Sequence, residues 1–333
     1  MHDYSLVTVA ASQYPVEFVG SWQRYTEKIE RMVRQAVEQG AEILLFSEYG
    51  CLELASLFPY EVYSDLQRQL VALQLLLSDF RNLHRQLARD YGVYLVSSSF
   101  PVRLDDGTYR NRAYFCAPDG TLDYQDKLIM TRWEREQWNI TPGHAIKVFR
   151  TRFGIVGINI CYDSEFPLIA RAQAELGARL ILAPSFTDTL AGYHRVRIGC
   201  QARALENQCY VVSAPVIGEA AWSLALERGY GAAGVFTPVD AGFPEDGVLI
   251  QGALNQPQWL ISRLDLAAVD TVRQSGSVTN FADWRGQDRL VAEPLHEDWL
   301  TPALVTSLAY DRHMARKVLH STDAAHFAIQ QEN

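Results

Sequence analysis

The sequence predicts an α/β protein in which two sheets pair and helices cover them on the outside. Short apolar runs typical of strands alternate with longer segments that carry apolar residues at helical spacing. A strand–helix–strand–helix–strand–hairpin order occurs twice, and no Pro-rich or Ser-rich linker separates the two halves of the 333-residue chain. Such alternation is typical of layered α/β architectures, so we expect paired sheets rather than two independent domains.

The first half is expected to contain three strands, two helices and one hairpin. In chain order these are a strand at 6–12, a helix at 22–39, a strand at 42–46, a helix at 64–91, a strand at 93–100 and a hairpin at 112–125. Gly40 and Gly92 follow the two helices, as glycines often do at helix C-termini. Asp119-Gly120 provides the residues favoured in a tight hairpin turn.

The second half repeats this order and is followed by a polar tail. Its expected elements are a strand at 155–160, a helix at 166–176, a strand at 179–183, a helix at 195–208, a strand at 209–214, a hairpin with arms at 232–238 and 248–252, and a strand at 259–264. Beyond about residue 270 the chain is mostly polar, with one helical pattern at 303–317. We expect a domain at 1–270 and a tail at 271–333 that packs on the domain or on a partner subunit.

Composition and charge exclude several classes of function. With 48% hydrophobic and 21% charged residues, the chain has the composition of a soluble globular protein. A net charge of −9 argues against nucleic acid as a partner. No apolar run approaches the roughly 18 residues of a membrane span. The N-terminus lacks a basic region followed by an apolar stretch, so no membrane association and no secretory signal are expected.

The five cysteines, at positions 51, 116, 161, 200 and 209, are odd in number and irregularly spaced. This fits reduced thiols in a cytoplasmic protein better than a disulfide framework. The chain has no Cys-x-x-Cys pair, no His-x-x-x-His pair and no Gly-rich phosphate loop. We therefore expect neither a metal site nor a nucleotide cofactor.

Three chemically distinct side chains follow predicted strands. Glu48 comes after an apolar run at 43–46, Lys127 after the strand-like segment 122–125, and Cys161 after the strand within GINICYDSEFP. None of the other four cysteines ends a strand with a polar turn behind it. A carboxylate, an ammonium and a thiol at strand ends could act as base, anion stabiliser and nucleophile.

These motifs resemble those of the nitrilase, or carbon–nitrogen hydrolase, superfamily, and specifically its aliphatic amidase and N-carbamoyl hydrolase branches. FSEY at 46–49, YQDK at 124–127 and INICYD at 158–163 are similar to the glutamate, lysine and cysteine motifs of that family, in the same order. Three further segments are also similar: EQWNITPG at 136–143, APSF at 183–186 and RALENQCYVV at 203–212. The resemblance extends from about residue 5 to residue 265.

The resemblance implies an αββα sandwich of two mixed β-sheets that pairs with another subunit as a homodimer or higher homo-oligomer. It implies that Glu48 is the base, that Cys161 is the nucleophile, and that Lys127 stabilises the oxyanion together with the backbone N–H of Tyr162. It also implies a second glutamate that positions the substrate and helps to hold Lys127. Glu136, seven residues before Gly143, is expected in this role, with Glu134 as the alternative. No cofactor is required.

Two more residues of the motifs have expected structural roles. Asp163 is expected to cap the helix that follows it. Arg203 and Glu206 are expected to form an ion pair on one helix. The chain also departs from the family, since Glu165 stands where many relatives carry arginine, and no histidine follows two residues after Lys127.

The expected substrate is a small-molecule amide, cleaved through a thioester. The sequence Cys161-Tyr162-Asp163 is similar to the amide-hydrolysing branches, whereas nitrile-hydrolysing relatives usually have Cys-Trp-Glu. An N-carbamoyl amine hydrolase or a nitrilase is the enzymatic alternative. An acyltransferase that uses an amine in place of water, and a catalytically idle scaffold or binding subunit, also stay open.

Overall fold

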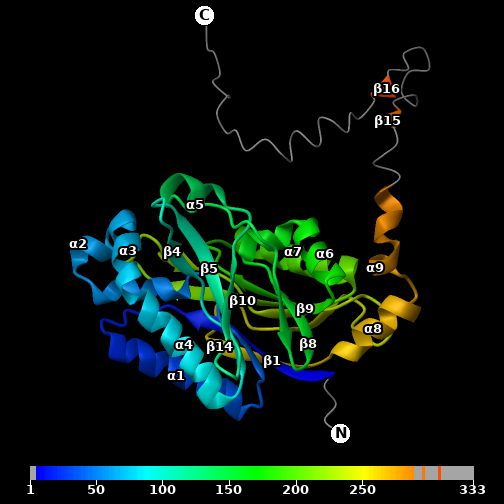
Figure 1. Cartoon of the computed structure of the whole chain (residues 1–333), viewed down its shortest axis with the longest axis horizontal. Coiled ribbons are helices and arrows are strands. Elements are labelled where there is room, and N and C mark those ends of the chain that lie inside the picture. Colours follow the sequence, from blue (N-terminus) through cyan, green and yellow to red (C-terminus); the bar gives the residue numbers. More distant parts are fainter. Residues whose placement is uncertain (1–4, 289–294, 297–306, 309–333) are drawn as a thin grey trace, which may run out of the picture. The chain divides into compact units, whose positions relative to one another are not determined.

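The structure is a computed structural model that describes residues 5–288, 295–296 and 307–308 (Figure 1). The chain divides into two compact units, Met1–Phe281 and Ala282–Asn333. The second unit contains the short 3-10 helix η4 (Trp284–Gln287) and an antiparallel pair of two-residue strands, β15 (Leu295–His296) and β16 (Ser307–Leu308). The helix expected at 303–317 lies outside the described residues except for 307–308, which form a strand instead.

The first sheet is mixed and belongs to the N-terminal half and the last long strand. Its parallel strands are β1 (Leu6–Pro15), β2 (Ile43–Leu45) and β3 (Tyr94–Val96). Its antiparallel strands are β14 (Gln258–Asp265) beside β1, and β5 (Tyr109–Cys116) beside β3, with β4 (Phe100–Arg103) and β6 (Leu122–Asp126) paired to β5. β5 and β6 form the expected hairpin, and Lys127 directly follows it.

The second sheet repeats this plan. Its parallel strands are β8 (Gly154–Ile158), β9 (Ala178–Ser185) and β10 (Tyr210–Glu219). Its antiparallel strands are β7 (Val148–Thr151), β12 (Gly234–Phe236) and β13 (Val248–Gln251), while β11 (Arg228–Gly229) pairs with the end of β10. Among the described strands, the two sheets share one ladder contact, in which Tyr14 and Pro15 of β1 pair with Val216 and Ile217 of β10.

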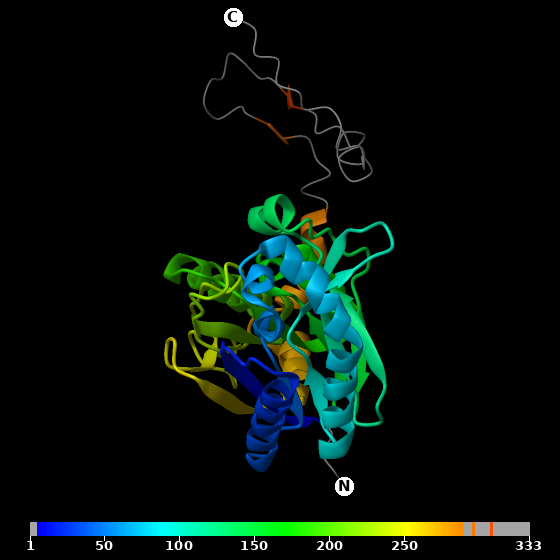
Figure 2. The same cartoon turned by 90° about the vertical axis from the view of Figure 1, so that its left-hand side faces the viewer.

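Helices cover the outer faces of both sheets. α1 (Trp22–Glu38) and α4 (Leu77–Tyr91) lie side by side on the first sheet, and α6 (Pro167–Glu175) and α7 (Leu190–Asn207) on the second (Figures 1 and 2). Between the sheets, Phe115 of β5 stacks on Phe149 of β7 with ring centroids 4.7 Å apart. Two clusters of buried apolar side chains fill the contacts between these helices and sheets, and the predicted αββα sandwich is confirmed.

Two expected elements are interrupted. The helix expected at 64–91 is divided into α3 (Leu66–Leu73), the 3-10 turn η2 (Gln74–Leu76) and α4. At this break the Gln74 side chain donates to the carbonyl of Pro101 at 2.7 Å and accepts from the N–H of Arg103 at 2.9 Å. These bonds fasten the turn to β4. The strand expected at 93–100 is likewise two strands, because residues 97–99 turn between β3 and β4.

Several short elements have no counterpart among the expected ones. Among them are η1 (Gly50–Leu57), α2 (Tyr60–Tyr63), α5 (Arg132–Gln137), β7, β11, α8 (Leu266–Ser275) and α9 (Asn280–Asp283). α8 crosses the expected boundary at residue 270 and belongs to the first unit, where Val269 and Val272 are buried. None of the described helices is both long enough and apolar enough to cross a lipid bilayer.

Candidate active site

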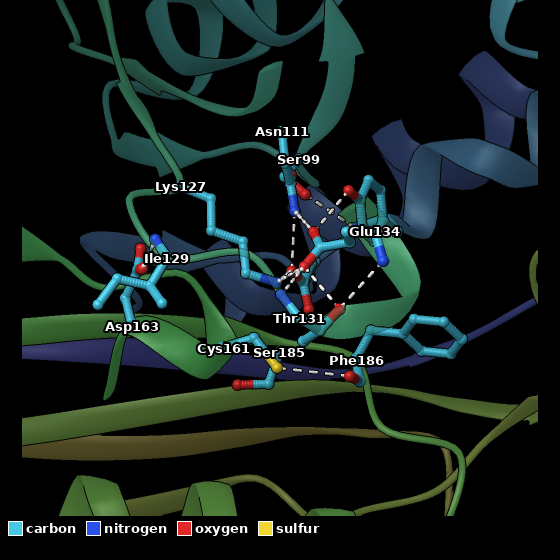
Figure 3. Close-up of polar contacts among 12 residues, drawn as sticks. Ser99, Asn111, Lys127, Ile129, Thr131, Glu134, Cys161, Asp163, Ser185 and Phe186 are labelled. Atoms are coloured by element: carbon cyan, nitrogen blue, oxygen red, sulfur yellow. Dashed lines mark hydrogen bonds and ion pairs between the residues drawn. The ribbon is translucent and has the colours of Figure 1, made fainter. Parts of the chain in front are cut away.

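The three strand-end residues singled out in the sequence line one cavity. Glu48 lies beyond the end of β2, Lys127 follows β6, and Cys161 begins the 3-10 turn η3 (Cys161–Glu165) after β8. The cavity has a volume of about 950 Å³ and also contains Glu134 and Tyr162 in its wall. Figure 3 shows Lys127, Asn111 and Glu134 pointing toward one another beside Cys161.

Lys127 is buried between two carboxylates. Its Nζ lies 2.8 Å from Oε1 of Glu48 and 2.6 Å from Oε2 of Glu134, and its side chain is only 1% exposed. The backbone N–H of Lys127 donates to the carbonyl of Asn111 at 2.8 Å, and its carbonyl accepts from the N–H of Gly143 at 2.8 Å. A Cβ at Gly143 would lie 2.8 Å from Cβ of Asp126, so a glycine is needed for this close approach.

The charges of this cluster follow from burial and mutual contact. Burial lowers the pKa of Lys127, but the Glu134 and Glu48 carboxylates outweigh it and hold that pKa well above its ordinary value. Burial raises the pKa of Glu134, yet the Lys127 ammonium reverses this effect, so Glu134 stays ionised. For Glu48, burial and the nearby Glu134 charge prevail over Lys127, and its pKa is raised. Glu48 is therefore the carboxylate that accepts a proton more readily.

Glu134, not Glu136, holds Lys127, so the prediction for Glu136 is wrong. Both glutamates belong to helix α5, whose N-cap Thr131 forms a capping box with Glu134. Oε2 of Glu134 turns back to accept from the Thr131 N–H at 2.9 Å and from Lys127. Glu136 is two residues, or about 200°, further around the helix. There its carboxylate is half exposed and pairs with Arg132 at 2.6 Å.

Cys161 sits in a conformation that side-chain-bearing residues rarely adopt. Its φ is +49°, in the left-handed region, and its Sγ lies 3.4 Å from the carbonyl oxygen of Phe186. Burial and the nearby Glu48 carboxylate raise the pKa of the Cys161 thiol, while Lys127 lowers it. The other four cysteines are fully buried and do not line the cavity.

Asp163 connects the cysteine turn to the lysine segment. Its carboxylate accepts from the backbone N–H groups of Leu128 and Ile129, at 3.1 and 2.8 Å. Burial raises the pKa of Asp163 to about 7. The expectation that it caps the following helix is wrong, because α6 begins after Phe166 with Pro167 at its first position and no side-chain cap. Asp163 instead fixes the position of Cys161 relative to Lys127.

Three polar residues of the site were not found from the sequence. Nδ2 of Asn111, on β5, donates to Glu48 at 2.8 Å and to Glu134 at 3.1 Å. The Tyr49 hydroxyl donates to Glu134 at 2.8 Å, and the Thr131 hydroxyl to Glu134 at 2.9 Å. Only Thr131 carried a local signal, since Thr131-x-x-Glu134 is the sequence pattern of a capping box.

The remaining predicted residues lie as follows. Tyr162 lines the cavity, and the role of its backbone N–H stays a prediction. Arg203 and Glu206 form the expected ion pair at 3.0 Å, and Arg203 also donates to the carbonyl of Ser164 in η3 at 3.1 Å. Within the described parts of the chain, no group of three or more His, Cys, Asp or Glu side chains is arranged to hold a metal ion.

Comparison with known proteins identifies the family. The sequence model described as Carbon-nitrogen hydrolase matches residues 8–238. The chain belongs to the carbon–nitrogen hydrolase family. This confirms the membership that the motifs around Glu48, Lys127 and Cys161 predict.

Individual known proteins are similar to this chain in sequence or in fold. "Probable hydrolase YhcX" of Bacillus subtilis (strain 168) is 33% identical over 279 residues, which are 84% of this chain and 54% of that protein. The chain thus spans about half the length of that relative. "Omega-amidase NIT2-B" of Xenopus laevis is 27% identical over 193 residues, 55% of this chain and 66% of that protein. The solved carbon–nitrogen hydrolase from Helicobacter pylori G27 superposes with a TM-score of 0.68 at 18% identity, over 82% of this chain and 94% of that one, which shows a common fold.

Proposed function

We propose that this protein is a cysteine-dependent amidase, which hydrolyses carbon–nitrogen bonds other than peptide bonds. One observation carries the proposal: a buried Lys127 ammonium lies between the Glu48 and Glu134 carboxylates, in the same cavity as the Cys161 thiol. Such a group supplies a base, a fixed positive charge and a nucleophile at one point. It needs no cofactor.

The first half of the reaction forms a thioester. Glu48 accepts the thiol proton of Cys161, and the thiolate sulfur attacks the amide carbonyl carbon. The raised pKa of Glu48 suits a group that must take up this proton and then release it. When the carbon–nitrogen bond breaks, Glu48 gives the proton to the departing nitrogen. Ammonia or an amine leaves, and the acyl group stays on Cys161.

The oxyanion that forms during attack needs positive charge and N–H donors. Lys127 remains an ammonium because both carboxylates raise its pKa. It therefore stabilises the oxyanion by its charge and by hydrogen bonding, without transferring a proton. The N–H of Tyr162 is the second donor. Removing a single donor of this kind typically slows catalysis by about 10²–10³-fold. Glu134 positions Lys127 through its 2.6 Å contact with Nζ.

The second half of the reaction releases the acid. Glu48 takes a proton from water, and the resulting hydroxide oxygen attacks the thioester carbonyl. The carbon–sulfur bond breaks, the carboxylic acid departs, and the Cys161 thiol recovers its proton from Glu48. One water is consumed for each amide cleaved, and no oxidant or reductant takes part.

An amide is preferred to the other substrates that this chemistry allows. The sequence Cys161-Tyr162-Asp163 resembles the amide-hydrolysing branches, and the relative from Xenopus laevis is named as an amidase. N-carbamoyl amines and nitriles are the alternatives. An idle scaffold would have no use for a buried ammonium, since taking a charge out of water costs several kcal/mol even when it is paired. A homo-oligomer in the cytoplasm remains our expectation for the assembly and location.

A substrate panel tests this proposal. Simple aliphatic amides, N-carbamoyl amines and nitriles are incubated with the full chain, and ammonia release is measured. We expect release from amides, and none with Cys161→Ala. Cys51→Ala is the matched control, because Cys51 is a buried thiol outside the cavity. Equal turnover by the parent and by Cys161→Ala would contradict the proposal, as would release from nitriles alone.

A further inference from the structure

Away from Lys127 and its two carboxylate partners, the wall of the cavity carries more acidic than basic residues. Outside the Lys127 cluster its charged residues are Glu165, Asp188, Glu219, Glu227, Arg132, Arg195 and Arg228. Four of these residues are acidic and three are basic, and two of the arginines already have carboxylate partners: Arg132 pairs with Glu136, outside the cavity, at 2.6 Å, and Arg228 pairs with Glu219 at 3.4 Å. Acidic residues therefore outnumber basic residues in this part of the cavity wall. A cavity of this sign favours positively charged molecules over negatively charged ones.

Among the acidic residues of this wall, Glu165 is the closest to Cys161 in the sequence. Both lie on the turn η3, which begins at Cys161 and ends at Glu165. Its neighbour Ser164 is held by Arg203, and a Cβ at Gly199 of α7 would lie 2.9 Å from the Ser164 carbonyl oxygen. Helix α7 therefore packs tightly on η3. The carboxylate of Glu165 is carried by a fixed piece of backbone.

The charge of Glu165 is poorly compensated within the chain. Its side chain is 22% exposed, and its one ion pair is a 3.6 Å contact with Arg195, whose side chain is 64% exposed. Burial raises the pKa of Glu165, while Arg195 and Lys127 lower it. A long contact to an exposed arginine recovers little of the hydration that burial removes. A cationic group of a ligand in the cavity would give the Glu165 carboxylate a second ion pair, beside Arg195.

We propose that Glu165 binds a cationic group on the substrate, and that the preferred substrates are amides whose acyl part carries an ammonium or guanidinium group. This inference rests on the proposed amidase function for the reaction, but the charge selectivity of the cavity does not depend on it. Glu165 acts as a specificity residue. The acyl chain extends from Cys161 toward Glu165, and an anionic acyl group is disfavoured by the same carboxylate.

The first experiment measures charge selectivity at the thiol without requiring amide turnover. Cys161 is modified by three methanethiosulfonates that carry a 2-aminoethyl, a methyl or a 2-sulfonatoethyl group. The Cys161 sulfur attacks the sulfenyl sulfur, a disulfide forms and methanesulfinate leaves. Rates are followed by mass spectrometry of the Cys161 peptide and divided by those of a free thiol. We expect the cationic reagent to react at least about tenfold faster than the anionic one.

Substitution of Glu165 shows whether this residue is responsible. Glu165→Gln should lower the ratio of cationic to anionic rates by roughly tenfold, as expected for loss of one charge-assisted contact, and Glu165→Asp should restore part of it. Glu245→Gln removes one negative charge at an exposed residue outside the cavity, and should leave the ratio unchanged. An unchanged ratio in Glu165→Gln, or faster reaction of the anionic reagent with the parent, would overturn the proposal.

The second experiment compares matched amides. Straight-chain amides that end in an ammonium, a methyl or a carboxylate group are compared by kcat/KM, at several chain lengths. We expect the ammonium series to be preferred, and the ratio of kcat/KM between the ammonium and methyl series to fall about tenfold in Glu165→Gln but not in the control Glu245→Gln. If no amide is cleaved while Cys161 still prefers the cationic reagent, the proposed function fails and the role of Glu165 stands. If methyl-ended or carboxylate-ended amides are cleaved best, the role of Glu165 fails and the proposed function stands.

Discussion

Two separate variants, Glu134→Gln and Glu136→Gln, test which of these glutamates holds Lys127. Oε2 of Glu134 lies 2.6 Å from Nζ of Lys127, and both side chains are almost completely buried. Removing one partner of a buried ion pair typically costs about 3–5 kcal/mol, because the remaining charge stays desolvated. In Glu134→Gln the Lys127 ammonium keeps only Glu48, and its position beside the oxyanion is lost. The stability cost should lower the melting temperature. Because Lys127 is then misplaced as an oxyanion donor, we expect kcat/KM to fall by about 100- to 1,000-fold.

Glu136→Gln is the matched control two residues away. Glu136 contacts Arg132 on the surface, where the Arg132 side chain is 82% exposed. Exposed pairs of this kind contribute about 0–1 kcal/mol to stability. We therefore expect kcat/KM within about twofold of the parent and an unchanged melting temperature.

The assay is ammonia release from the best amide of the panel, combined with thermal unfolding and the rate at which iodoacetamide alkylates Cys161. In Glu134→Gln we expect Cys161 alone to be alkylated, whereas an unfolded chain would expose all five thiols, so the number of labels separates loss of catalysis from loss of fold. The reasoning is refuted if Glu134→Gln is fully active, or if Glu136→Gln is inactive while folded.

Three further outcomes follow from the structure. Lys127→Ala should lower kcat by at least about 10²-fold, measured by ammonia release. A fully active variant would show that Lys127 does not stabilise the oxyanion. Glu48 must be ionised to accept the thiol proton, and its pKa is raised above 4.5, the ordinary value of a glutamate. On acidification, kcat/KM should therefore begin to fall while the pH is still above 4.5. A pH profile that stays flat below 4.5 would contradict the role of Glu48 as the base. The apolar side chains of Leu168 on α6 and Ile198 on α7 are 69% and 60% exposed, so light scattering should give at least twice 37.6 kDa, and Ile198→Asp should shift the mass toward one chain; a parent protein that is monomeric at micromolar concentration would contradict this.

The features that the sequence predicts well are those set by local pattern. The apolar runs at 43–46 and 155–160 overlap with the strands β2 and β8, and Glu48 and Cys161 follow these strands as predicted. The spacing of apolar residues identifies α1, which begins at Trp22 after its N-cap Ser21. Two strand–helix repeats without a linker suffice to predict two sheets with outer helices.

The features that the sequence does not predict depend on contacts between distant segments. Asn111 reaches Glu48 and Glu134 because β5 lies in the same sheet as β2, and nothing in the neighbouring residues indicates this. Where the helix expected at 64–91 is interrupted, the Gln74 side chain bonds to the backbone of β4, a contact that the local sequence does not indicate.

The error at Glu136 has a different cause. The prediction of Glu136 rests on its position seven residues before Gly143, whereas the capped helix α5 determines which side chain faces Lys127. The pattern Thr131-x-x-Glu134 marks the start of that helix and would have selected Glu134.

Selective alkylation of Cys161 is the most direct test of the central claim that this thiol is the nucleophile. The full chain is treated with iodoacetamide until amidase activity is lost, and the modified peptides are identified and counted by mass spectrometry. Because the other four thiols are fully buried, we expect one label per chain, on Cys161, and activity that declines in proportion to that label. Complete inactivation with the label on Cys51 or Cys209 and an unmodified Cys161, or full activity with Cys161 alkylated, would contradict the account.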